Sequence, residues 1–508
     1  MSRDRSPKDT EEVDHHNLSG QSAAKNAGFV AAAECIGKLS TLAWTVVAAQ
    51  QLGQAGFGVF NLALAIGLII VAIGQWGFDT VMVRRASQDT SQLSRFFSES
   101  IIWQIVLAAP LLVIGGAVFA LVETDRNAAL ATVMVLCAVL CDMVSDNARA
   151  ASSTIHRQGI TSAALIGQRI IMFAAATPLV LWKGDVVTLS AAFLFASVFG
   201  LALHGLALRR LKIYFRLSLV TVHGLRNCFR GTGSIGLSSL IQVLQARIGF
   251  IVLGAVAGQH AVGSYSAAFR LYETVLFLSF AVGAAVFPLM SVTESARELR
   301  KLIEGTINIL CGFYLPFAAV CLIDATGMID LVFGGQYVAD ASQALRWLAP
   351  APLLFAVAFI GRTALVASSS TRSLLISAVA STGALLLLCL LLVPIIGAAG
   401  ATIALTSSLA VEAVIMVFFL RAVLDSWPQL LRQSIQPILC SGIVVLVFLI
   451  MDASFIVELL VAAGIYTVCW GGLLWRGRSS ASQLFRALPS RRSHGSDSNG
   501  PEVSDDSA

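Results

Sequence analysis

Four arginines inside long apolar stretches are the side chains of this sequence best placed to do chemistry. They are Arg169, Arg247, Arg270 and Arg362. A charge in the middle of a membrane-spanning helix is costly, and it usually faces a cavity or an opposite charge. A guanidinium group holds phosphate oxygens through paired, charge-assisted hydrogen bonds. The four positions therefore predict a cation-lined cavity that attracts an anionic group.

Arg247 is the leading candidate for this cavity because of its depth. Its helix is expected to begin near residue 233, so Arg247 lies roughly 21 Å from the inner end at about 1.5 Å per residue. That is beyond the middle of a hydrocarbon core of about 30 Å. Gln242 and Gln245 add polarity to the same helix, although neither shares a helix face with Arg247. We expect Arg247 to be an unpaired cation that points into the cavity.

Two other basic candidates have structural alternatives. Arg270 lies three residues before Glu273, so an ion pair within the helix is the alternative to an auxiliary role in binding. Lys38 could also bind the anion, but Glu34 lies four residues before it and could neutralise it.

Acidic residues within the apolar stretches could bind a coupling cation. The candidates are Asp79, Asp142, Asp146 and Glu273. The alternatives are structural: Asp142 and Asp146 either reach interfacial water or pair with Arg149, and Asp79 balances the neighbouring Arg84 and Arg85. The nine cysteines show no zinc-ligand spacing, so neither a metal nor another cofactor is predicted.

The elements that carry these residues are predicted to be membrane-spanning helices. The chain is 57% hydrophobic and 12% charged, whereas soluble domains carry roughly 25% charged residues. Most apolar runs reach about 20 residues, enough to cross a bilayer. We therefore predict an all-α polytopic membrane protein with about 14 transmembrane helices. The expected spans are 27–50, 57–83, 99–122, 128–148, 161–182, 186–207, 233–255, 261–290, 305–331, 345–368, 373–393, 396–420, 433–451 and 455–475.

Loop charges predict the orientation of these helices. With a cytoplasmic N-terminus, the outer loops hold only Arg126, Lys183 and Arg346, and the other loop Lys and Arg residues are cytoplasmic. This bias is typical of loops that remain inside the cell, so both termini are expected to be cytoplasmic. The net charge of +5 then reflects membrane topology, and no nucleic-acid partner is predicted.

An internal repeat predicts how the helices are grouped. The segment GQAGFGVFNLA at 53–63 resembles GQHAVGSYSAA at 258–268, and each lies at an outer turn between two helices. Such a repeat predicts two six-helix lobes related by a pseudo-two-fold axis along the membrane normal; the alternative is that small residues suit any tight turn. The expected divisions are a cytoplasmic tail 1–24, an N-terminal lobe 25–208, a basic cytoplasmic linker 209–232, a C-terminal lobe 233–425, two further helices in 426–476 and a disordered cytoplasmic tail 477–508.

Several segments resemble one known family. KNAGFVAAAECIGKL at 25–39, the glycine-rich 49–87, LSSLIQVLQARIGFIVLGAVAGQHAVGSYSAAFRL at 237–271 and LVFGGQYVADASQALRWLAP at 331–350 are similar to Wzx-type polysaccharide-repeat-unit flippases. These belong to the multidrug/oligosaccharidyl-lipid/polysaccharide exporter superfamily. The resemblance covers residues 24 to about 425. One departure is Gly249, where the family often has an acidic residue.

The resemblance implies a flippase in the bacterial inner membrane. It would move undecaprenyl-pyrophosphate-linked oligosaccharide to the periplasmic leaflet for exopolysaccharide or O-antigen (lipopolysaccharide) synthesis. Its partners would be membrane lipids, the lipid-linked substrate and polysaccharide polymerases. The alternatives are a cation-coupled multidrug exporter of the same superfamily and a polytopic enzyme acting on lipid-linked sugars. The short outer loops disfavour an enzyme, and the intramembrane arginines disfavour export of cationic drugs.

Overall fold

The described part of the chain is built from α-helices. The computed structural model describes residues 20–475 except 123–124, 156, 231, 294, 368–370, 422–426 and 452. Within those residues there is no β-strand. The prediction of an all-α polytopic membrane protein is confirmed, whereas the predicted tails lie mostly outside the described residues.

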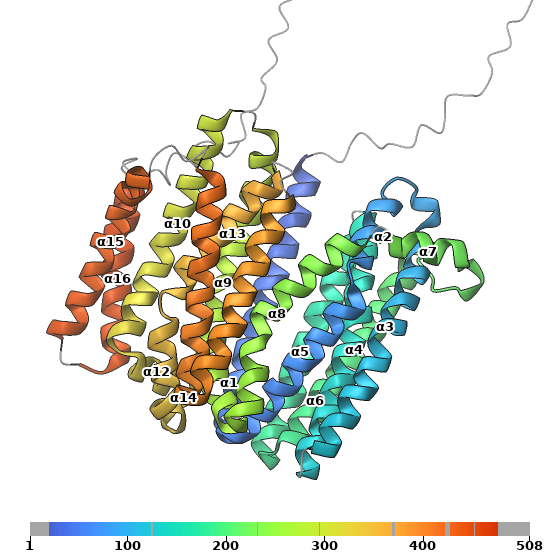
Figure 1. Ribbon diagram of the computed structural model, residues 1–508, viewed down its shortest axis with the longest axis horizontal. Helices are drawn as coiled ribbons and strands as arrows, with labels where there is room; N and C mark the ends of the chain where they lie inside the picture. Colours follow the sequence, from blue (N-terminus) through green and yellow to red (C-terminus); the bar gives the residue numbers. More distant parts are fainter. Residues whose placement is uncertain are drawn as a thin grey trace, which may run out of the picture.

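Two helix bundles dominate the arrangement (Figure 1). They lie together at one end and diverge toward the end that carries α2 and α7. The first bundle, here the N-lobe, contains α1 (Gly20–Gln75), α2 (Phe78–Ala86), α3 (Leu93–Val122), α4 (Arg126–Thr154), α5 (Gln158–Lys183) and α6 (Val186–Arg210).

The second bundle follows a short amphipathic helix, α7 (Val222–Arg230). This bundle, here the C-lobe, contains α8 (Gly233–Val256), α9 (Gly258–Val292), α10 (Ala296–Ile323), α11 (Ala325–Phe333), α12 (Val338–Leu348), α13 (Ala351–Ala367) and α14 (Thr371–Leu420). The last two helices, α15 (Trp427–Ile450) and α16 (Phe455–Trp475), pack beside α10 at the edge of the C-lobe (Figure 1). The lobe boundaries expected from the sequence stay predictions.

Two helices are far longer than one membrane crossing. Helices α1 and α14 hold 56 and 50 residues, or about 84 and 75 Å at 1.5 Å per residue. Each contains a break, at Gly53 with φ +65° and at Ile396 and Gly397. Glycine reaches positive φ without steric penalty, so the chain reverses there without a loop. The sequence prediction placed a loop between 50 and 57, whereas helical residues continue on both sides of Gly53.

The number of spans depends on how the broken helices are counted. Among the described residues, ten helices are long and apolar enough to cross a membrane, or up to eleven if α12 and α13, which bend by 40°, form one span. The predicted span 305–331 is wrong at its end, because α10 stops at Ile323 and Asp324 caps the separate helix α11. The prediction of fourteen spans stays a prediction.

The two repeat segments pack against each other. A Cβ atom on Gly58 would lie 1.8 Å from the carbonyl oxygen of Gln259, and one on Gly263 would lie 1.9 Å from that of Gln54. Gln54 and Gln259 are equivalent in the repeat, as are Gly58 and Gly263. Each segment therefore makes the same contact with its counterpart, which is the pattern of an isologous interface. Only glycine allows two helix backbones to approach this closely.

Candidate functional site

A cavity of about 260 Å³ lies between the two lobes. We call it the interlobe cavity. Its walls come from α1, α4 and α5 of the N-lobe and from α9 of the C-lobe. The polar side chains that line it are Thr41, Arg149, Arg169, Arg270, Glu273 and Thr274. Three guanidinium groups and one carboxylate thus line a single space between the lobes, so its lining favours an anion.

Glu273 organises the C-lobe wall of the cavity. Its two carboxylate oxygens accept from Arg270 at 2.9 Å and from Arg247 at 3.1 Å. Arg270 and Glu273 belong to α9, whereas Arg247 reaches across from α8. One carboxylate therefore holds two cations, which leaves excess positive charge beside the cavity. The ion pair expected within α9 is present, and Arg270 lines the cavity as well.

Arg247 differs from its prediction. The sequence argument required an unpaired cation, and this premise is wrong because Glu273 binds it. Its guanidinium group also lies 5.7 Å from the ring centre of Phe250 and 5.6 Å from that of Phe269. These contacts hold Arg247 among side chains of the C-lobe, and it is not one of the residues that line the cavity. Spacing along one helix could not reveal a partner on another.

Of the three arginines that line the cavity, Arg169 has the fewest contacts with acidic side chains. No carboxylate whose side chain the structure describes lies at ion-pair distance from its guanidinium group, although Asp142 is close enough for the two charges to interact. Asp142 itself accepts a hydrogen bond from Gln168 at 2.7 Å. On the same wall, Asp146 lies 2.5 Å from Arg149, so the pairing considered for Asp146 is present. The N-lobe wall therefore presents Arg169 and Arg149.

Two predicted binding residues lie in a different place. Arg362 pairs with Glu412 at 3.0 Å, and Gln245 donates to the same carboxylate at 2.8 Å and to Ser381 Oγ at 3.3 Å. We call these four residues the C-lobe cluster; they join α8, α13 and α14. Glu412 is fully buried. Arg362 and Gln245 are therefore not part of the interlobe cavity, contrary to their predicted role, because Glu412 holds both inside the C-lobe.

Glu412 and Arg149 are the residues that sequence reasoning missed. Glu412 is an isolated acid in an apolar run, a signal visible in the sequence. The sequence predicts Arg149 in a cytoplasmic loop, but α4 continues to Thr154 and carries it into the cavity wall.

Gln242 and Asp79 are not among the residues that line the cavity. Gln242 is exposed, and its amide donates to the Ser238 carbonyl of its own helix at 3.4 Å. Asp79 lies on α2 and accepts from the Thr80 hydroxyl at 3.5 Å. Lys38 belongs to α1, but its side chain lies outside the described residues. Throughout the part of the chain that the structure describes, no group of His, Cys, Asp and Glu residues could hold a metal ion.

The lobes close over the cavity at the end where α1 and α9 cross. There, side-chain amides and a tyrosine of one lobe bind main-chain carbonyls of the other. Gln50 donates to the Val332 carbonyl at 3.0 Å, and Gln336 donates back to the Gln50 carbonyl at 2.8 Å. Tyr337 donates to the Ala49 carbonyl at 2.8 Å. These bonds join the broken turn of α1 to the segment between α11 and α12.

A larger cavity of about 570 Å³ lies between α3 and α7, lined in part by Arg85, Arg95 and Glu99. All its walls belong to the N-lobe and the linker. Arg95 pairs with Glu99 at 3.0 Å, and Arg85 donates to the Asn227 carbonyl. The interlobe cavity is therefore the better candidate site, since both lobes contribute charged side chains to it.

The fold is similar to that of several membrane transporters of known structure. The structure is similar to the lipid II flippase MurJ in an inward closed conformation, with a TM-score of 0.72 and 12% identity over 88% of this chain and 99% of that one. It is also similar to an inward-facing multidrug resistance MATE family transporter of the MOP superfamily, with a TM-score of 0.60 and 16% identity over 77% and 96%. A MOP superfamily transporter from Pyrococcus furiosus gives a TM-score of 0.58 and 14% identity over 79% and 96%.

Sequence comparison identifies the family. Residues 23–294 match the profile of the polysaccharide biosynthesis protein family, so the chain belongs to that family. This confirms the resemblance found in the sequence. A comparison with curated protein sequences found no match.

Proposed function

We propose that this protein is a flippase for a lipid-linked oligosaccharide whose lipid carries a diphosphate. The observation that carries the proposal is the interlobe cavity, in which Arg149, Arg169 and Arg270 face one carboxylate, Glu273. Membership of the polysaccharide biosynthesis protein family supports a sugar-bearing substrate. The sequence-based expectation is that the substrate is undecaprenyl-pyrophosphate-linked and moves from the cytoplasmic to the periplasmic leaflet.

The charges of the cavity suit a diphosphate. A diphosphate offers several oxygens in one small group, and each guanidinium can donate two parallel hydrogen bonds to it. Arg169 and Arg270 approach from opposite lobes, so an anion between them would attract both walls at once. Binding would then draw the lobes together around the headgroup, which couples substrate binding to lobe movement.

The size of the cavity indicates which part of the substrate it takes. Sites for drug-sized ligands measure roughly 300–1,000 Å³, so 260 Å³ suits a headgroup and not a whole oligosaccharide. The sugar chain would require the lobes to separate further. The hydrogen bonds of Gln50, Gln336 and Tyr337 at the closed end would have to break for release on that side.

Export of cationic drugs is the competing function. MATE family transporters share the fold, and fold alone does not decide the substrate. A cavity lined by three arginines repels a cation unless other acidic groups outweigh them. The arginines therefore favour the anionic substrate.

Replacement of Arg169 tests the proposal. We expect Arg169→Ala to reduce polysaccharide export by at least tenfold in cells that depend on this protein, with the lipid-linked precursor accumulating in the cytoplasmic leaflet. Arg169→Lys should keep part of the activity because the charge survives without the bidentate geometry. Exposed Arg346 supplies the matched control, and Arg346→Ala should export normally.

Membrane levels of each variant must be measured in parallel. Normal export by a well-inserted Arg169→Ala protein would refute the role of the cavity. Protection of cells from cationic drugs by the wild-type protein, without any effect on polysaccharide, would favour the competing function.

A further inference from the structure

The segment between the lobes combines positive charge with exposed apolar side chains. Residues 209–230 contain no Asp or Glu. The exposed basic residues are Arg209, Arg210, Lys212, Arg216 and Arg226. No carboxylate in the described part of the chain forms an ion pair with any of them. This segment therefore keeps a concentrated positive charge.

Large apolar side chains lie exposed between these charges. Val222 is 85% exposed, Leu217 68% and Phe215 47%. Scattered exposed apolar residues are ordinary, but a contiguous set on a linker outside the bundles marks a surface that binds something apolar. Val222 and Arg226 lie one helical turn apart on α7, which places an apolar and a basic side chain on one exposed face. The Phe229 ring packs instead toward the bundle, 5.1 Å from the Trp103 ring and 6.2 Å from the Phe78 ring.

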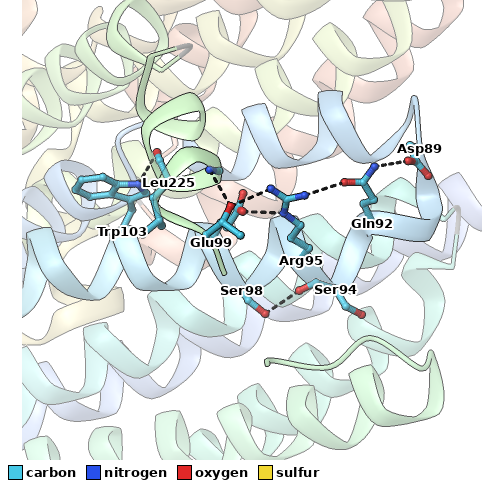
Figure 2. A network of polar contacts seen from close by, with 10 residues as sticks. Asp89, Gln92, Ser94, Arg95, Ser98, Glu99, Trp103 and Leu225 are labelled. Atoms are coloured by element: carbon cyan, nitrogen blue, oxygen red, sulfur yellow. Dashed lines mark hydrogen bonds and ion pairs between the residues drawn. The ribbon is translucent and has the colours of Figure 1, made fainter. Parts of the chain in front are cut away.

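The opposite face of α7 is fixed to α3. Figure 2 shows the polar residues of α3 that meet the linker, including Arg95, Glu99 and Trp103. The Trp103 indole donates to the Leu225 carbonyl at 2.9 Å, and Arg95 donates to the Thr221 hydroxyl at 3.1 Å. Gly224 lies so close to Glu99 that an added Cβ would stand 1.9 Å from a carboxylate oxygen. The exposed face is therefore held in a defined orientation.

The ends of the linker determine where it lies relative to a membrane. α6 ends at Arg210 and α8 begins at Gly233, and both are long and apolar enough to span a bilayer. A segment that joins two such helices at the same end remains near the headgroup region. Figure 1 shows α7 beside α2 at this end of the N-lobe. An amphipathic basic helix in that position has the features of an interfacial membrane helix.

We propose that residues 209–230 bind anionic phospholipid headgroups on the membrane surface that they face. Arg216 and Arg226 contact lipid phosphates, while Leu217 and Val222 insert below the headgroups. Anionic lipid attracts juxtamembrane basic residues, and the attraction falls with ionic strength. This lipid-binding surface is separate from the interlobe cavity, so it would anchor the linker while the lobes move.

Lipid titration of the purified full-length protein tests the charge component. Native mass spectrometry would compare phosphatidylglycerol with phosphatidylcholine for the wild type and for R216Q/R226Q. We expect the wild type to prefer phosphatidylglycerol by about tenfold or more and the variant to lose most of that preference. The matched control is R297Q/K301Q, which removes two exposed charges from the start of α10 and should change the preference less than about twofold.

Photocrosslinking in lipid nanodiscs tests insertion. p-Benzoylphenylalanine replacing Val222 should form adducts with phosphatidylglycerol, whereas the same residue replacing exposed Gln88 in the α2–α3 loop should form few. Inorganic phosphate added at equal concentration should not displace the lipid. Displacement by phosphate, absence of adducts at 222, or equal losses in the two charge variants would each overturn the proposal.

A thiol in α7 reports whether the linker stays docked in these variants. Burial raises the pKa of Cys228 to about 11, so the thiol is protonated near neutral pH and reacts slowly with alkylating reagents. Cys228 should remain slow in R216Q/R226Q when followed by peptide mass spectrometry. If Cys228 is alkylated slowly and the preference for phosphatidylglycerol is lost, the two removed charges account for that loss. Rapid alkylation of Cys228 would show that the linker had detached from α3 and would overturn the role of the charges.

Discussion

The interlobe cavity and the C-lobe cluster both contain arginine and glutamate, but they differ in access and in charge balance. In the C-lobe cluster one arginine meets one fully buried carboxylate, and Gln245 donates a hydrogen bond to that carboxylate. In the cavity, Glu273 is shared by two arginines and remains 27% exposed, with Arg169 opposite. The first arrangement is neutral and closed, and the second is positive and open to a ligand. An arginine in a membrane-spanning helix is therefore available to a ligand only where the acidic residues around it leave some of the positive charge unneutralised.

The largest effect is expected from removing the buried carboxylate of the C-lobe cluster. Glu412→Ala would leave Arg362 and Gln245 without their shared acceptor inside the C-lobe, which costs about 3–5 kcal/mol for a buried pair. We expect poor membrane insertion or a clearly lowered thermal unfolding temperature in detergent. Wild-type stability in this variant would show that the cluster is not structural and would weaken the contrast with the cavity.

Arg247→Ala should have a smaller effect on stability. Arg247 is about 17% exposed and shares Glu273 with Arg270, so its loss leaves that carboxylate paired. We expect a destabilisation of about 1–2 kcal/mol, part of it from lost contact with Phe250 and Phe269. Export should fall less than in Arg169→Ala. The comparison requires both variants at matched membrane levels, and a greater loss of export in Arg247→Ala would return Arg247 to the leading role.

Glu273→Gln tests the charge balance of the cavity without removing volume. It raises the net positive charge beside Arg270, so we expect inorganic pyrophosphate to bind the purified protein several-fold more tightly. Isothermal titration calorimetry would measure this change. Glu304→Gln is the control, because Glu304 pairs with Arg300 at 2.6 Å outside the cavity. An equal increase in pyrophosphate affinity in this variant would show that the effect of Glu273→Gln does not come from the cavity.

Gln242→Ala should have the smallest effect. Its side chain is exposed and bonds only within α8 at 3.4 Å, a surface position where substitutions change stability by about 0.5 kcal/mol or less. Thermal unfolding and export should both match the wild type. A marked loss of export would indicate that Gln242 meets substrate in another conformation.

Much of the architecture was determined by the sequence itself. Long apolar runs can satisfy their backbone hydrogen bonds in lipid only as helices or closed barrels, and their length and continuity favoured helices. The repeat around Gly58 and Gly263 predicted an internal relationship, and the two glycines do meet each other's segment. These features depend on the hydropathy and size of residues that are close in the sequence, so they can be predicted from the sequence alone.

Only the tertiary structure decided which charges remain available. Arg247 and Arg362 both lie in apolar stretches with no acidic residue three or four positions away. Their partners Glu273 and Glu412 lie 26 and 50 positions farther along the chain and on different helices. Helical periodicity relates residues within a helix, whereas pairing in a bundle depends on how helices rotate and cross. The same packing placed Arg149 and Arg169 beside Arg270, because α4 and α5 of one lobe face α9 of the other.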